Sequence, residues 1–382
     1  MRNIEALTRT VRAELARLTN THPDDWFLVF RARYGVESVL RSLGNQKGSG
    51  EVITQPFTCT TALNPILSAG HIPTYVDTSY NDLSLDTSRL QANTSSRAII
   101  MQHSFGIESD MEKARAFADK HRLLLLEDSA HQLGLLSKKD DVPLADVSVH
   151  SFGVEKLLST KFGGAVWVNP GMKDVALRES ICTALEKLPV ISSRQGRKVR
   201  RYRFFNRALN HTPTFAEPTL RSLLVSTGLF EPAIMPDELT GRNHDKPAKP
   251  NDYILQEMAH GLKSYKQTIQ IRRHAADVYR KSLPEAFTVP SHVPDDYAPV
   301  RFPVLCKDAA TALLLFESLR TSGHYSGKWY RPILFPGAGD PAPYNYDAEL
   351  FPVAEDISAR ILNLPTNITV TEAKEIADVL HG

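Results

Sequence analysis

The stretch LLLLEDSAHQLG, at residues 123–134, decides the fold of this chain. Its first four residues, Leu123–Leu126, are apolar at every position, which is typical of a central strand buried on both faces of a parallel sheet. Glu127 and Asp128 follow directly, at the end of that predicted strand. Because ligands of open α/β sheets bind at the carboxyl ends of the strands, we expect a ligand site near Asp128.

Two more motifs lie downstream of this stretch. SFGVEK occupies residues 151–156, at the end of the next predicted strand, and Gly163-Gly164 lead into another one. Strand ends of a parallel sheet meet at one edge, so the sequence predicts that Asp128 and Lys156 lie close together there.

The same alternation of short apolar runs and amphipathic stretches extends over residues 26–170. This spacing predicts βαβ units and a mostly parallel sheet covered by helices. The predicted strands are Trp26–Phe30, Glu51–Thr54, Ile72–Val76, Ala98–Gln102, Leu123–Glu127, Val147–Phe152 and Ala165–Val168. The predicted helices between them include Val36–Leu43, Thr60–Ala69 and Asp110–His121.

The length of 382 residues favours two domains. We expect a large domain over residues 1–265, with a helical but irregular, proline-interrupted segment at 171–250, and a small C-terminal α+β domain over 266–382. A long helical pattern at Tyr253–Leu283 resembles a connector between them. The small domain's predicted elements are Val300–Cys306, Ala309–Leu319, Ile361–Leu364 and Thr371–Leu380.

Composition excludes several classes of protein. The formal net charge is only +2, which gives no reason to expect nucleic acid. The three cysteines, Cys59, Cys182 and Cys306, are far apart, so we expect neither a disulfide framework nor a metal site. Residues 1–20 have the pattern of an amphipathic helix rather than a signal peptide, and no apolar run is long enough for a membrane span. The sequence predicts a cytoplasmic protein without a membrane partner.

A carboxylate and a lysine at one edge of the sheet suit pyridoxal 5′-phosphate. A lysine amine condenses with its aldehyde, and an aspartate holds its pyridine nitrogen protonated, which keeps the ring an electron sink. The lysine must be neutral to attack, and burial lowers its pKa. Asp128 and Lys156 are therefore candidates for these two roles.

These motifs resemble those of the DegT/DnrJ/EryC1/StrS sugar aminotransferases, a pyridoxal-phosphate family of fold type I. EDSAHQLG at 127–134 matches the family's E-D-A-A-(Q/H)-x-L-G, SFGVEK matches S-F-x-x-x-K, and Gly163-Gly164 match its G-G. Further matches are Pro56-Phe57-Thr58 with Asn64, HSFG at 103–106 and ILNLPT at 361–366. The similarity covers most of the chain apart from residues 171–250.

The resemblance implies roles for individual residues. Lys156 would be the Schiff-base lysine, Asp128 the partner of the pyridine nitrogen, His131 a contact of the phenolic oxygen, and Ser151 a phosphate ligand. Gly35 would begin a helix whose N-terminus receives the phosphate. At two further cofactor-binding positions the chain departs from the family: Val36 stands where Thr is usual, and Cys59 where many members stack an aromatic ring.

Plainer interpretations stay open for each residue. Asp128 alone suits a helix N-cap, Lys156 a solvated surface lysine, His131 a packed core histidine and Gly35 a turn glycine. Lys161 would be the reactive lysine if the alignment slips. The basic run Arg194–Arg207 suits a solvated helix face, a contact to a substrate diphosphate or, less well, a nucleic-acid contact.

The resemblance implies an aminotransferase that moves an amino group from an amino acid, with glutamate the expected donor, to a keto-sugar, expected to be nucleotide-linked. It also implies a homodimer, with Asn251 a weak candidate for a cofactor contact in trans. Two alternatives remain: a pyridoxal-phosphate enzyme of another reaction type, such as elimination, and a degenerate member that acts as a binding or scaffold protein.

Overall fold

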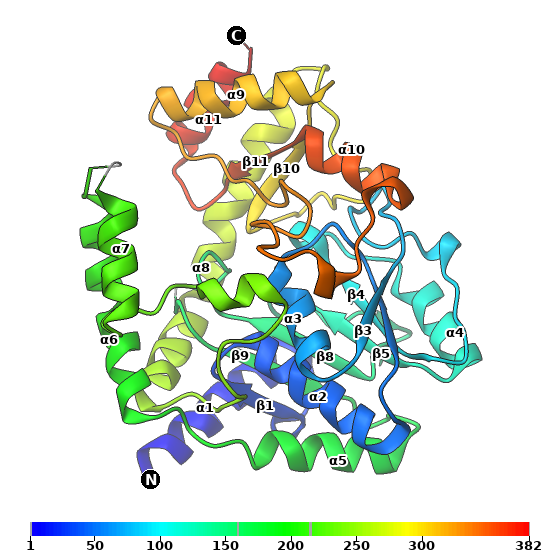
Figure 1. Ribbon diagram of the computed structural model, residues 1–382. Helices are drawn as coiled ribbons and strands as arrows, with labels where there is room; N and C mark the ends of the chain where they lie inside the picture. The colour runs from blue at the N-terminus through cyan, green and yellow to red at the C-terminus, as the bar shows by residue number, and fades with distance from the viewer. Residues whose placement is uncertain (1, 159, 214–215, 382) are drawn as a thin grey trace.

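A computed structural model describes residues 2–158, 160–213 and 216–381. Within these residues, a seven-stranded sheet forms the centre of the molecule, and helices pack on both of its faces (Figure 1). The α/β architecture predicted from the sequence is confirmed.

The sheet has the strand order β1-β9-β8-β5-β4-β2-β3. The strands β8, β5, β4, β2 and β3 pair in parallel, and β9 is antiparallel to both of its neighbours. All seven predicted strands are present, with ends within two residues of those predicted. They are β1 (Trp26–Val29), β2 (Glu51–Thr54), β3 (Ile72–Tyr75), β4 (Ser96–Gln102), β5 (Leu124–Asp128), β8 (Val147–Ser151) and β9 (Gly164–Val168).

Strand β5 explains why the sequence signal at 123–134 is so strong. Leu124 and Leu126 pack into the larger core, while Leu125 packs into a smaller core on the other face of the sheet. Neighbouring residues of a strand point to opposite faces, so a strand covered on both sides is apolar throughout. The larger core includes side chains of α2 (Ala32–Lys47) and α3 (Thr60–Ser68), and the smaller core those of α4 (Met111–His121).

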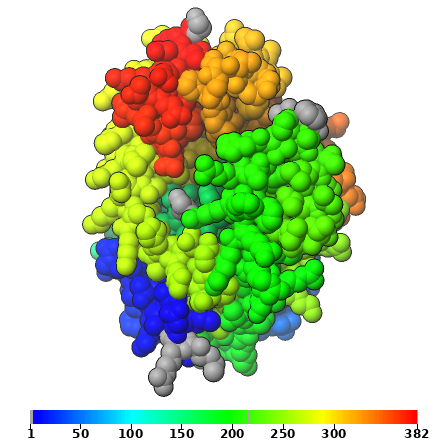
Figure 2. Space-filling view, turned by 90° about the vertical axis from the view of Figure 1, so that its left-hand side faces the viewer, coloured from blue at the N-terminus to red at the C-terminus, as the bar shows by residue number. Residues whose placement is uncertain are grey.

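The described residues between 171 and 250 contain three α-helices. They are α5 (Val175–Glu186), α6 (Ser193–Asn210) and α7 (Glu217–Ser226), and a short 3₁₀ helix, η4 (Pro236–Thr240), follows. Helices α6 and α7 lie side by side along one flank of the molecule (Figure 1), and the green surface that they form dominates the view from that flank (Figure 2).

The C-terminal part is built around a two-stranded antiparallel sheet. Its elements are α8 (Asp252–Ser282), β10 (Arg301–Leu305), α9 (Ala309–Thr321), α10 (Pro352–Arg360), β11 (Ile361–Pro365) and α11 (Val370–His381). Helix α8 is continuous across residue 265, and it packs against both α11 and the N-terminal helix α1 (Arg2–Thr19). The division into domains at residue 265 stays a prediction. None of the described helices is both long and apolar enough to cross a membrane.

Candidate active site

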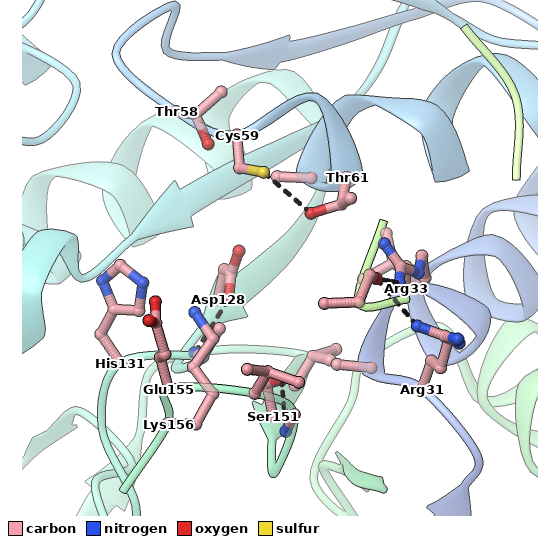
Figure 3. A pocket seen from close by; sticks show the side chains of 18 of the residues that line it. Arg31, Arg33, Thr58, Cys59, Thr61, Asp128, His131, Ser151, Glu155 and Lys156 are labelled. Carbon is pink, nitrogen blue, oxygen red and sulfur yellow. Dashed lines mark hydrogen bonds between the residues drawn. The ribbon is translucent and has the colours of Figure 1, made fainter. Parts of the chain in front are cut away.

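A cavity of about 400 Å³ lies at the carboxyl ends of β5 and β8 (Figure 3). This volume is in the range of small-molecule sites. Further lining residues come from the N-terminal ends of α2 and α3, the loop after β8 and residues 233–234 of the segment before α8. Trp329, Tyr330 and Phe335 of the C-terminal part also line the cavity. Elements far apart in the sequence thus meet around one space.

Asp128 and Glu127 end strand β5 and point to opposite sides. Glu127 is fully buried and accepts a hydrogen bond from His103 Nε2 at 2.9 Å. Asp128 lines the cavity, and its Oδ1 accepts a hydrogen bond from the Ala130 N–H at 2.9 Å. Burial raises the pKa of Asp128, although the Ala130 N–H and the charge of Lys156 oppose this shift. Because successive side chains of a strand point to opposite faces, the Glu127 carboxylate lies in the core and that of Asp128 in the cavity.

Lys156 lines the same cavity, as the sequence predicted, and Figure 3 shows its side chain next to that of Asp128. Burial lowers the pKa of its amine to about 8, although Asp128 acts in the opposite direction. Among the described residues, none forms a hydrogen bond or ion pair with its Nζ. An amine with this pKa is partly neutral near pH 7–8 and can act as a nucleophile.

Lys161 lines the cavity as well, so both candidate lysines reach it. Burial lowers the pKa of Lys161, and the charges that act on it are those of Arg203 and Glu155. The charge of Asp128 acts on Lys156 but is not among the influences on Lys161. The geometry therefore favours Lys156 as the partner of Asp128.

His131 is buried in the cavity wall. Its Nδ1 accepts a hydrogen bond from the Phe105 N–H at 3.0 Å, and its Nε2 lies 3.2 Å from the Tyr330 hydroxyl. Burial lowers the pKa of His131 well below its usual value, and the charges of Lys156 and Arg301 add to this effect. The ring is therefore neutral, and because Nδ1 accepts, Nε2 carries the proton.

The prediction that Gly35 begins the helix that receives the phosphate is wrong. Helix α2 begins at Ala32, with Arg31 as its N-cap, and not at Gly35. Gly35 lies inside the helix and is not part of the cavity wall, whereas Val36 is. A Cβ at Gly35 would lie 2.4 Å from Val166 Cγ2, so this glycine allows α2 to pack closely on β9.

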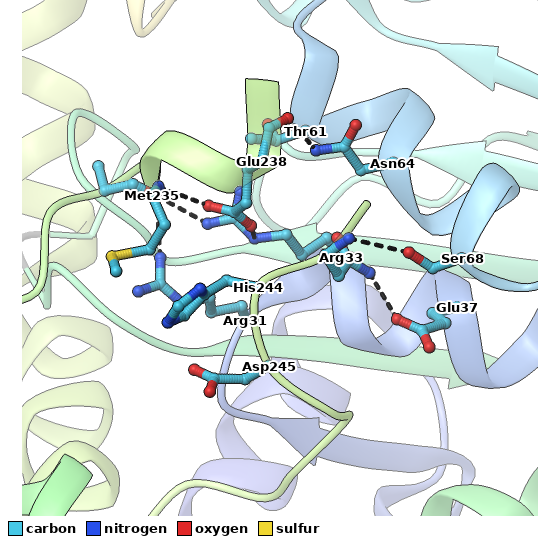
Figure 4. A network of polar contacts seen from close by, with 12 residues as sticks. Arg31, Arg33, Glu37, Thr61, Asn64, Ser68, Met235, Glu238, His244 and Asp245 are labelled. Carbon is cyan, nitrogen blue, oxygen red and sulfur yellow. Dashed lines mark hydrogen bonds and ion pairs between the residues drawn. The ribbon is translucent and has the colours of Figure 1, made fainter. Parts of the chain in front are cut away.

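The first turn of α2 brings two arginines to the cavity that the sequence analysis missed. Arg31 and Arg33 line it, and both donate hydrogen bonds to the Ala233 carbonyl oxygen. Each also pairs with a buried carboxylate of the segment before α8: Arg31 with Glu231 at 2.7 Å, and Arg33 with Glu238 at 3.2 Å (Figure 4). A separation of about 200 residues hides these pairs from any local sequence pattern.

Ser151 and Cys59 complete the predicted set, and both line the cavity. Ser151 Oγ accepts a long hydrogen bond from the Gly153 N–H at 3.4 Å. Cys59 is the N-cap of α3, and its sulfur lies 3.1 Å from the Thr61 hydroxyl. Cys59 therefore places a small thiol, and no aromatic ring, at that wall.

Aromatic side chains come from a segment to which the sequence analysis gave no role. Trp329 stacks on His131, with ring centres 4.9 Å apart and planes 4° from parallel. The same ring lies 4.7 Å from Lys156 Nζ, and the Arg301 guanidinium lies 4.1 Å from its centre. Trp329 thus connects the predicted cofactor residues to the C-terminal part.

The remaining candidates lie elsewhere. The cavity lining includes none of the basic residues of α6, so the suggested clamp on a substrate diphosphate has no support from the geometry of this chain. Asn251 is the N-cap of α8 and accepts a hydrogen bond from the Ile254 N–H. No cluster of three or more potential metal ligands occurs among the described residues.

The residues present fit pyridoxal 5′-phosphate. Within the described chain, Asp128 uses only one carboxylate oxygen in hydrogen bonds, and Lys156 uses none of its three donors, so both can serve a ligand. The first N–H groups of a helix have no partner within it, and Ala32 and Arg33, in the first turn of α2, line the cavity. Ser151 lies in the same wall.

Comparison with known proteins points to one family. Residues 32–211 match the sequence model of the DegT/DnrJ/EryC1/StrS aminotransferase family. The spore coat polysaccharide biosynthesis protein SpsC of Bacillus subtilis is 35% identical over 124 residues, 31% of this chain and 32% of that protein. GDP-perosamine synthase of Vibrio cholerae is 29% identical over 133 residues, 34% and 36% of the two chains. The matched regions thus span about a third of these relatives.

Solved structures share the whole fold. Helicobacter pylori PseC, an aminotransferase of pseudaminic acid biosynthesis, superposes with a TM-score of 0.69 at 21% identity, over 97% of this chain and 89% of PseC. DesV of S. venezuelae gives a TM-score of 0.69 at 19% identity, over 99% and 88%. At this level of identity the likeness concerns the fold.

Proposed function

Because residues 32–211 of this chain match the sequence model of the DegT/DnrJ/EryC1/StrS aminotransferase family, we propose that the protein is a pyridoxal-phosphate-dependent aminotransferase of that family. One observation carries the proposal. Asp128, at the end of β5, and Lys156, in the loop after the neighbouring strand β8, line one cavity, and burial lowers the pKa of the Lys156 amine to about 8. A solvated surface lysine would show neither feature.

Each residue has a defined task in this proposal. Lys156, as a neutral amine, would hold the cofactor through its aldehyde, and the same amine would move the proton at the substrate carbon. Asp128 holds the pyridine nitrogen protonated, and His131 donates a hydrogen bond to the phenolic oxygen. The first turn of α2, with Arg33, and Ser151 hold the phosphate. The bound cofactor supplies the electron sink.

For the substrates we propose an amino-acid donor, with glutamate the first candidate, and a nucleotide-linked keto-sugar as acceptor. The names of the relatives support this class: one acts in polysaccharide biosynthesis, and another is a GDP-perosamine synthase. Because the sequence matches cover only a third of those proteins, the substrate rests on analogy. A cytoplasmic homodimer, with Asn251 of one subunit near the other's site, belongs to the same proposal.

A binding or scaffold protein is the second candidate. The observation that favours it is the pairing of Arg31 with Glu231 and of Arg33 with Glu238, since these carboxylates already neutralise the two arginines beside the phosphate end. A cofactor phosphate would have to share those guanidinium groups. A scaffold protein of this family would need no such rearrangement.

The absorption spectrum of the purified protein separates the two candidates. We expect added pyridoxal 5′-phosphate to give a protein-bound absorption band that the Lys156→Ala variant lacks. Glutamate should then convert this band to that of the amine form of the cofactor, and a nucleotide-linked keto-sugar should restore it. A wild-type spectrum without a bound band would support the scaffold protein, and a band that no amino acid alters would contradict an aminotransferase.

A further inference from the structure

Helix α6 carries an unbalanced positive charge. Its 18 residues, Ser193–Asn210, include six arginines and one lysine but no acidic residue. A helix with this composition, placed along one flank of a protein whose net charge is only +2, concentrates the charge on one surface. None of these side chains lines the cavity, so the proposed reaction leaves the charge unexplained.

The inner face of α6 is apolar and fixes the helix to the body. Val199 and Tyr202 are buried there, and the Tyr202 ring contacts those of Phe162 and Phe230 at 5.2 and 5.3 Å. Phe162 itself lines the cavity. The cavity therefore lies on the inner side of α6. A partner bound to the opposite, solvent-facing side of this helix would leave the cavity uncovered.

The outer face combines arginines with an exposed aromatic ring. Arg197, Arg201 and Phe204 are spaced i, i+4 and i+7, which places them on one side of the helix, and Arg200 and Arg207 flank that side. All five are exposed, and Phe204 has 71% of its surface accessible. On the neighbouring α7, Leu223 is exposed as well. We call Arg197, Arg200, Arg201, Phe204 and Arg207 of α6 the outer face.

Much of this charge has no acidic partner. Arg200 lies 3.7 Å from Asp252, and Arg203, beside the outer face, pairs with Glu257. For Arg197, Arg201 and Arg207, no ion pair is found within the described parts of the chain. Three arginines around an exposed phenylalanine are thus free to meet an external anionic surface.

We propose that the outer face docks onto an anionic phospholipid bilayer, with Phe204 entering the headgroup region and the arginines contacting lipid phosphates. A convex helix face presents its charges to an extended surface and does not enclose a small anion. Nucleic acid would use the arginines, but a lipid surface also accommodates Phe204 and Leu223. The expectation of no membrane partner came from the lack of a spanning segment, and peripheral docking needs none.

Vesicle co-sedimentation of the full-length protein tests the proposal. At low ionic strength, the protein should sediment with phosphatidylglycerol-containing vesicles, not with pure phosphatidylcholine vesicles, and added salt should release it. The Arg197→Glu/Arg201→Glu variant should bind the vesicles about tenfold more weakly or worse. Phe204→Ser should also bind them more weakly than the wild type. A matched control, Lys120→Glu/Lys374→Glu, changes two exposed lysines on α4 and α11 by the same total charge and should bind like the wild type.

Several outcomes would overturn the proposal. Lack of sedimentation with anionic vesicles, or an equal loss in the control variant, would mean that the outer face is no lipid site. A Phe204→Ser variant that binds vesicles unchanged, together with duplex DNA bound as tightly as vesicles, would indicate a general polyanion surface instead. Circular dichroism of each variant shows whether it is folded, and Phe204→Ser, at an exposed position, tests the apolar contribution without a change in charge.

Discussion

The amine of Lys156 lies 4.7 Å from the centre of the Trp329 ring, which in turn stacks on His131. The indole covers the lysine and is itself only 8% exposed. This arrangement keeps water from the amine, and such desolvation favours the neutral form of a lysine. A residue from the C-terminal part thus shields a lysine in the loop between β8 and β9.

The first prediction concerns pH. The neutral fraction of Lys156 rises about tenfold per pH unit below its pKa of about 8, so the rate of cofactor capture should rise with pH and level off above 8. Stopped-flow absorbance from pH 6 to 10 measures this. Trp329→Ala should move the midpoint upward, because solvent then reaches the amine. A wild-type rate that still climbs at pH 10 would show that the lysine is not desolvated.

The second prediction concerns Asp128→Asn. This variant should fold normally, because an asparagine oxygen can still accept the hydrogen bond of the Ala130 N–H. It should lose nearly all transamination, since an uncharged partner no longer holds the pyridine nitrogen protonated. Thermal melting followed by circular dichroism and the rate of the amino-donor half-reaction measure the two effects. Full activity would make Asp128 a structural residue.

The third prediction concerns the neighbouring carboxylate. Burial alone would raise the pKa of Glu127, but hydrogen bonds from His103 and Ser137 lower it to about 2. This depressed pKa contributes stability that is present above pH 4.5 and is lost as the pH falls toward 2. Glu127→Gln should therefore reduce the free energy of unfolding at pH 7 by about 3 kcal/mol.

Urea denaturation between pH 7 and pH 3 tests this stability difference. The free energy of unfolding of the wild type should fall toward that of the Glu127→Gln variant as the pH drops below 4.5. The exposed Glu112→Gln variant is the control, because solvent screens a surface pair such as that of Glu112 with Lys139, and its loss should change the stability little. If the free energies of unfolding of the wild type and of Glu127→Gln differ by the same amount over this pH range, the stabilisation does not come from the charge of Glu127.

The fourth prediction compares two positions at the phosphate end. A hydrogen bond to a charged phosphate is worth about 1.5–3 kcal/mol, or about ten- to a hundredfold in affinity. Arg33→Met combined with Glu238→Gln removes the cation without leaving an unpaired carboxylate, and it should weaken cofactor binding by that factor. Val36→Thr adds a hydroxyl to the cavity wall and should tighten binding. Fluorescence titration with pyridoxal 5′-phosphate measures both, and unchanged affinities would mean that the phosphate lies elsewhere.

The central sheet could be predicted from the sequence because its signals are local. Four apolar residues at Leu123–Leu126, followed by two carboxylates, indicate a buried strand that ends at a ligand site. The same reasoning placed Asp128 and Lys156 at one edge, and the structure agrees.

The start of α2 could not be predicted, because its N-cap, Arg31, makes no capping hydrogen bond with its side chain. The usual signal of Ser, Thr, Asp or Asn is therefore missing. The pairs of Arg31 and Arg33 depend on tertiary contacts with Glu231 and Glu238. Trp329 lies in an irregular segment without periodicity, so no pattern in the sequence predicts that its side chain lines the cavity.

Reduction of the cofactor-loaded protein with borohydride, followed by peptide mass spectrometry, tests the central claim most directly. Both Lys156 and Lys161 line the cavity, so the position of the adduct decides between them. We predict that the reduced cofactor is attached to Lys156, and that Lys156→Ala abolishes the adduct while Lys161→Ala retains it. An adduct on Lys161, or on no lysine at all, would contradict the assignment of Lys156 as the cofactor-binding residue.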